Sequence, residues 1–203
     1  MGVISNGTTL LDAGALSVAS GPMTHIKTLT ASSSATLDFL NGVSSVVFDG
    51  TYDAYVFKFI NIHPATDAVK FTFQADTGTN TNYNQAITST MFESYHAEGD
   101  GAQGVGYETG HDQAQGTAFE GLCVIVGNDN DQSVSGTLRL FNPSSSVFVK
   151  HFMSTINCSS QNDNSQNDFK AGYFNTTTAL TRVRFKMSSG NIDSGTIKLY
   201  GIT

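Results

Sequence analysis

The sequence TRVRFKMSSGNIDSGTIKLYGIT, residues 181–203, decides the fold. Apolar and polar side chains alternate on both sides of the turn-forming residues 188–191, which is the pattern of two half-buried β-strands. We therefore predict that the chain finishes in a β-hairpin. Because untethered termini fray, we expect the last strand to lie inside a sheet, with Gly201 allowing close backbone packing. Truncation at Lys198 is then expected to impair folding before it impairs binding.

The same alternation recurs upstream of this stretch. It marks about ten strand segments at spacings of roughly 8 to 15 residues, and no amphipathic helix pattern separates them. One segment, residues 52–62, is apolar on both faces, as expected for a strand inside a sheet. Residues 85–96 fit either a strand or a short helix. The pattern predicts an all-β protein, an antiparallel jelly-roll-like β-sandwich formed by a single domain of residues 23–203.

The first 22 residues, MGVISNGTTLLDAGALSVASGP, differ in composition from the rest. They carry too few apolar side chains to fold alone. Two interpretations stay open: a flexible leader, or an extended arm that orders against a neighbouring subunit by adding a strand or filling a groove. We predict the docking arm, with Ile4, Leu10 and Leu11 as the contacting side chains.

Charge and hydropathy exclude several classes of protein. Only 13% of the 203 residues are charged, about half the usual share, and the formal net charge is −7. The ten Lys and Arg residues are scattered, which argues against nucleic-acid binding. No apolar run approaches the roughly 18 to 20 residues of a membrane span, and no secretory signal is visible, so we expect no membrane insertion and folding in a cytoplasm.

The two cysteines, Cys123 and Cys158, lie in apolar or β-like surroundings at no metal-ligand spacing. Thiols stay reduced in a cytoplasm, and cysteine packs there as a small apolar residue. We expect two buried free thiols, with a disulfide between neighbouring strands as the alternative.

The motifs of the common catalytic sites do not occur. The sequence lacks a nucleophile elbow, a His-Glu-x-x-His pair, a phosphate-binding glycine loop and a Cys-x-x-Cys pair, so we predict no enzyme activity and no cofactor. Asn and Asp at 128–131 offer oxygen ligands for calcium, but these residues also favour turns. We also weighed a metal site at His96, Glu98, His111 and Asp112; their spacing is not diagnostic, and we predict no metal.

Tyrosines beside polar loops are the clearest binding signal. Tyr83, Tyr95 and Tyr107 lie in or near the polar stretches 76–84, 98–116 and 159–168. There a ring can stack on a sugar while Asn, Gln and Asp side chains bond its hydroxyl groups. The absence of Trp weakens this hypothesis. The alternative is that these tyrosines pack loops or a subunit contact.

Several short motifs, spread over nearly the whole chain, resemble those of one family of phage proteins. They are ISNGTT (4–9), LDAG (11–14), NIHPATD (61–67), DQAQG (112–116), LFNPSS (140–145), AGYFN (171–175), SGNI (189–192) and LYGI (199–202). The chain thereby resembles small virion proteins of tailed phages from marine and cyanobacterial settings. Its motifs match turns and strand ends rather than catalytic residues.

The resemblance implies a non-enzymatic virion structural protein at the particle exterior, either a tail fibre or knob or a capsid decoration. Such a protein folds in the host cytoplasm and contacts other virion proteins and copies of itself. Because virion positions are symmetric, a trimer or another symmetric homo-oligomer is expected. The alternative function is a receptor- or glycan-binding module that contacts a host surface glycan through its polar loops.

Overall fold

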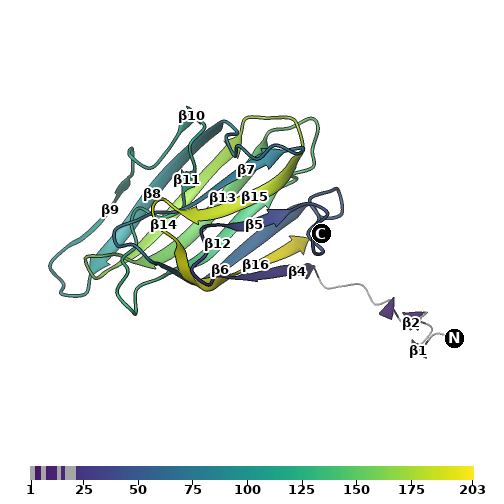
Figure 1. The fold of residues 1–203 in the computed structure, drawn as a ribbon, viewed down its shortest axis with the longest axis horizontal. Coiled ribbons are helices and arrows are strands. Elements are labelled where there is room, and N and C mark those ends of the chain that lie inside the picture. The colour runs from purple at the N-terminus through teal and green to yellow at the C-terminus, as the bar shows by residue number, and fades with distance from the viewer. Residues whose placement is uncertain (1–2, 6–7, 13–14, 17–21) are drawn as a thin grey trace.

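The protein is an antiparallel β-sandwich of two unequal sheets (Figure 1). The computed structural model describes residues 22–203 throughout, together with the backbone of residues 3–5, 8–12 and 15–16. Residues 22–203 form thirteen strands and no helix. The predicted all-β sandwich is confirmed, with more strands than the ten or so expected. No helix in the described part of the chain is long and apolar enough to cross a membrane.

The wide sheet has nine strands. In spatial order they are β10 (Ala114–Gly116), β8 (Ile87–Ala97), β14 (Asn164–Phe174), β13 (Lys150–Ser159), β12 (Val134–Phe141), β6 (Ala54–Pro64), β16 (Ile192–Ile202) and β4 (Met23–Thr30), while β9 (Gln103–Tyr107) also pairs with β8. The small sheet has four, in the order β11 (Glu120–Gly121), β7 (Phe71–Thr77), β15 (Leu180–Met187) and β5 (Leu37–Leu40).

A cluster of phenylalanine rings fills the space between the sheets. Its centre is Phe185 on β15, whose ring centroid lies 5.1 to 6.3 Å from those of five other rings. Those rings come from both sheets: Phe39, Phe57, Phe59, Phe71 and Phe73. Aromatic pairs at these separations add to the stabilisation from burial alone. The core is therefore one continuous layer that joins the two sheets.

The end of the chain corrects the hairpin prediction. The strands β15 and β16 both form, but they do not pair with each other: β15 lies between β7 and β5 in the small sheet, and β16 lies between β6 and β4 in the wide sheet. Alternation predicts a strand with one buried face, and both strands meet that condition by facing the core from opposite sides. The turn at 188–191 therefore crosses between the sheets.

The last strand is held on both sides, as predicted. Its pairing with β6 runs to Ile202, and its pairing with β4 ends at the same residue. At Gly201 an added Cβ would overlap the ring of Tyr52, so only glycine allows this close approach.

Several stretches expected to be loops contain strands. The polar stretch 98–116 holds β9 and β10, and the stretch 159–168 is already part of β14 from Asn164. Residues 85–96, whose sequence fits a strand or a short helix, contain most of the strand β8. Both Cys123 and Cys158 are buried free thiols, as predicted.

The N-terminal arm prediction concerns a part of the chain that the structure describes only as backbone. Three short strands, β1 (Val3–Ser5), β2 (Thr8–Asp12) and β3 (Ala15–Leu16), form a small sheet with β2 between the other two. The side chains of Ile4, Leu10 and Leu11 lie outside the described residues, so docking by this arm stays a prediction.

Candidate functional site

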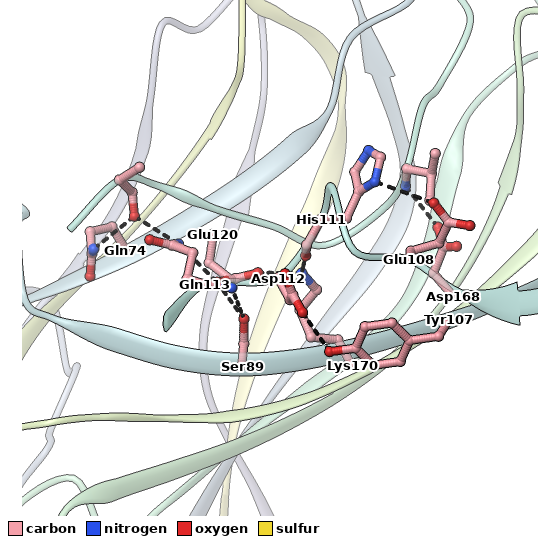
Figure 2. Close-up of polar contacts among 12 residues, drawn as sticks. Gln74, Ser89, Tyr107, Glu108, His111, Asp112, Gln113, Glu120, Asp168 and Lys170 are labelled. Atoms are coloured by element: carbon pink, nitrogen blue, oxygen red, sulfur yellow. Dashed lines mark hydrogen bonds and ion pairs between the residues drawn. The ribbon is translucent and has the colours of Figure 1, made fainter. Parts of the chain in front are cut away.

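Two neighbouring strands of the wide sheet carry the polar chemistry of the protein on their inner face. The strands β8 and β14 pair in continuous register from Ile87 opposite Phe174 to Ala97 opposite Asn164. Alternation turns every second side chain inward, and on these strands the inward residues include charged ones. Residues 108–125, which we call the covering segment, lie across this inner face and bond to it (Figure 2).

A buried ion pair fixes the covering segment to β14. Lys170 bonds both Glu120 and the backbone carbonyl oxygen of His111, and the exposed fractions of the Lys170 and Glu120 side chains are 0% and 1%. The second carboxylate oxygen of Glu120 accepts hydrogen bonds from Ser89 Oγ at 3.0 Å and Gln113 Nε2 at 2.8 Å (Figure 2). Burial lowers the pKa of Lys170, and the nearby Glu120 opposes that change. The pair thus joins three segments of the chain through one carboxylate.

Three carboxyl groups gather beside this pair. Asp168 is fully buried and accepts hydrogen bonds from the backbone N–H of Val124 and from Gln166 Nε2, both at 3.0 Å. Burial raises the pKa of Asp168 to about 6. Burial, followed by the neighbouring carboxyl groups of Glu108 and Asp168, raises the pKa of Glu93 to about 7. Asp168 and Glu93 therefore change charge close to neutral pH.

We expect Asp168 to lower the free energy of unfolding as the pH rises from about 4 to about 7, because burial raises its pKa to about 6 in the folded protein. In that window the folded protein holds protons that the unfolded chain has released, so the stabilisation is complete below the unfolded pKa and is lost as the pH rises through the folded pKa. For Asp168 the full change is at most about 3 kcal/mol. His111, whose pKa burial lowers, contributes the opposite slope.

Urea denaturation of the wild type and Asp168→Asn across this pH range measures the effect. The variant should have the flatter decline of stability with pH, since Asn does not titrate. An equally steep decline in both proteins would contradict this role of Asp168.

The predicted tyrosines fall in three different environments. Tyr83 is 2% exposed, and its ring is covered by the Arg184 guanidinium 4.0 Å from the ring centroid. It presents no free ring face, so it drops out of the candidate contact residues. Tyr107 on β9 is 54% exposed and donates a hydrogen bond to Asp112. Tyr95 lines a polar cavity of about 890 Å³ where β8 ends and β14 begins.

The other residues weighed as metal ligands do not come together. His96 Nε2 lies 3.0 Å from Asp100 Oδ1, whereas His111 Nδ1 lies 3.6 Å from Glu108 Oε2. Among the residues that the structure describes, no group of three or more His, Cys, Asp or Glu side chains is placed to hold a metal ion.

The opposite face of the wide sheet carries exposed aromatic side chains. Phe92 on β8 and Phe169 on β14 lie in register and stack, with ring centroids 4.8 Å apart and planes 11° from parallel. Phe92 is 49% exposed, and Met153 on β13 is 56% exposed. Phe92, Phe169 and Met153, with Arg139 on β12, line a cavity of about 420 Å³ on this outer face.

The outer face of β8, β14, β13 and β12 has no carboxylate. At the outward positions of these four strands, which the structure describes completely, the residues are aromatic, hydroxyl, amide or small, together with Met153, two histidines and Arg139. The acidic residues of these strands, Glu93 and Asp168, both point to the inner face. Sequence analysis missed this face, because Phe169 between Asp168 and Lys170 looks like an inward residue between two outward charges. In the structure the two charged side chains face inward, and the Phe169 side chain faces outward.

The fold and this site define the class of the molecule as a two-sheet antiparallel sandwich with a buried charge network. Comparison with protein-family models, with curated proteins and with solved structures finds no match.

Proposed function

We propose that this protein is a non-enzymatic structural protein of a bacteriophage virion. It forms part of an exterior appendage, a tail fibre or knob or a capsid decoration, and contacts other virion proteins. Its sandwich domain assembles into a symmetric homo-oligomer through the outer face of the wide sheet. The observation that carries this proposal is the exposed aromatic face without carboxylates in a protein of net charge −7. The resemblance of the sequence motifs to phage virion proteins supports the same function.

The chemistry of the outer face suits contact with another protein surface. Exposed apolar patches with a polar rim mark interaction sites, and aromatic residues, Met and Arg are enriched in them. Phe92, Met153 and Tyr107 are each about half exposed, so covering them would remove much apolar surface from water.

A second copy of this chain is the partner that the charges favour. Copies with a net charge of −7 repel one another over most of their surface. The outer face is an exception, because Arg139 is the only Lys, Arg, Asp or Glu at its outward positions on β8, β14, β13 and β12. Identical copies occupy symmetric positions on a virion. A surface that can contact the same surface of a second copy without charge repulsion allows such an assembly.

Sedimentation equilibrium of the full chain up to about 100 µM tests self-association. We expect a defined oligomer for the wild type. The double variant Phe92→Ser, Met153→Ser should have a dissociation constant at least about tenfold higher, because both side chains lie at the centre of the proposed contact. Its melting temperature should change little, since both side chains are half exposed.

The matched control is Tyr95→Ala, a change on β8 that faces the inner side and should leave the oligomer intact. A wild-type protein that stays monomeric throughout the range would contradict assembly through this face. Placement on the virion is tested separately by labelling particles of the encoding phage with antibodies to the domain. Unlabelled particles would contradict the virion role.

A further inference from the structure

A polar pocket opens on the inner side of the sandwich, where β8 ends and β14 begins. Its volume is about 890 Å³, which lies in the size range of small-molecule sites. Glu93 and Tyr95 line it from β8, Gln166 lines it from β14, and the turns at 98–102 and 160–164 form its rim. We call this cavity the polar pocket. It lies on the opposite side of β8 from the outer face.

Hydrogen bonds hold the rim in place. The backbone N–H of Glu98 donates to the carbonyl oxygen of Asp163 at 3.0 Å, which joins the two turns. The buried Gln132 donates from Nε2 to Asp163 Oδ1 at 3.1 Å and so orients that carboxylate. The pocket is therefore formed before any ligand binds, which reduces the entropic cost of binding.

The aromatic wall of the pocket has a fixed position as well. Tyr95 lies opposite Gly104 in the β8–β9 ladder, and its ring packs so closely that an added Cβ at Gly104 would lie 3.0 Å from Tyr95 Cε1. The Tyr95 ring occupies space that a side chain at position 104 would fill. Tyrosine in this role offers an apolar ring face and a polar tip.

The lining residues define the chemistry of the ligand. Carboxyl groups of Glu93, Glu98 and Asp163 and amide side chains at 162, 164 and 166 offer many hydrogen-bond partners, and Val124 contributes apolar surface. No Lys, Arg or His lines the pocket. Phosphates and acidic sugars are therefore disfavoured, whereas a ligand with many hydroxyl groups, neutral or carrying an amine, is complementary.

We propose that the polar pocket binds a neutral or amino-substituted saccharide unit, with the Tyr95 ring stacked on one face of the sugar and Glu93, Glu98 and Asp163 bonded to its polar groups. This binding function goes beyond the structural role proposed above and does not depend on self-association. The raised pKa of Glu93, about 7, lets its carboxyl group donate as well as accept a hydrogen bond near neutral pH.

Titration calorimetry and saturation-transfer NMR with four trisaccharides test this proposal. The probes are trimers of N-acetylglucosamine, glucosamine and glucose, with trigalacturonate as the anionic control. We expect at least one of the first three to bind with a dissociation constant of about 1 mM or tighter, and trigalacturonate not to bind. Tyr95→Ala should weaken binding at least about tenfold through loss of the stacking surface.

The double variant Phe92→Ser, Met153→Ser is the matched control, because it alters the outer face and should bind the sugar as the wild type does. If Tyr95→Ala lowers the melting temperature, Glu98→Gln tests the same pocket, since the Glu98 side chain is exposed and its replacement spares the fold.

Three results would overturn the proposal. They are no binding of the neutral and amino trisaccharides at about 10 mM, sugar binding that survives both pocket variants, and tighter binding of trilysine than of any sugar. The oligomeric state from sedimentation is measured independently, so failure here leaves assembly through the outer face untouched.

Discussion

Truncation after Lys198 is expected to abolish cooperative folding. The change removes residues 199–203, including the fully buried Leu199 and Gly201, which packs against Tyr52. The lost residues pair with β6 on one side and with β4 on the other, so both neighbouring strands lose part of their hydrogen-bonded ladder. Burial of one Leu side chain contributes about 2 kcal/mol, and the lost ladders add to it, against a total stability of about 5 to 15 kcal/mol.

Far-UV circular dichroism and a thermal melt of the truncated chain test this expectation. We expect no cooperative transition. Deletion of Thr203 alone is the control, because this residue is exposed and follows the last paired residue, and it should melt like the wild type. A soluble truncated protein with a single sharp transition would show that the end of β16 contributes less to the fold than its pairing on both sides indicates.

Replacement of Lys170 by Met is expected to destabilise the protein strongly. The change leaves the Glu120 carboxylate buried without its cation, although Ser89 and Gln113 still donate to it. Removing one partner of a buried ion pair costs about 3 to 5 kcal/mol, because the remaining charge is not compensated. For a chain of this length the melting temperature should fall by about 10 °C.

The second substitution of the pair separates charge from packing. In the double variant Lys170→Met, Glu120→Gln no unpaired charge is buried, so at least half of the lost stability should return. Lys198→Met on β16 is the matched control: this side chain is only partly buried, and its replacement should change stability by no more than about 0.5 kcal/mol. A single variant Lys170→Met as stable as the wild type would show that packing, not charge, holds the covering segment.

The inner and outer faces of β14 explain why the candidate site was hard to find in the sequence. Asp168 and Lys170 face the core because partners from the covering segment, the Val124 N–H and Glu120, satisfy them there. Those partners are 44 and 50 residues away in sequence, so alternation alone assigns the charges to solvent. Phe169 is left on the outer face as a consequence.

The three candidate tyrosines show the same limit of sequence patterns for the binding site. Local sequence placed Tyr83, Tyr95 and Tyr107 beside polar stretches, but it contained no sign of which ring is covered. Arg184 from β15 covers Tyr83, whereas Tyr95 lines an open pocket whose rim is formed by the turns at 98–102 and 160–164. Because these groups lie far apart in the sequence, local sequence patterns could not predict which of them make contact.

The sequence by itself determined that this protein is an antiparallel all-β sandwich, that its last residues form strands, and that both cysteines are buried. Each of these follows from alternation and burial, which act between near neighbours in the chain. Only the tertiary structure decided that residues 181–203 cross between two sheets instead of forming a hairpin. A strand buries the same face whichever sheet it joins, so the choice of partner depends on hydrogen bonds and packing between segments far apart in sequence.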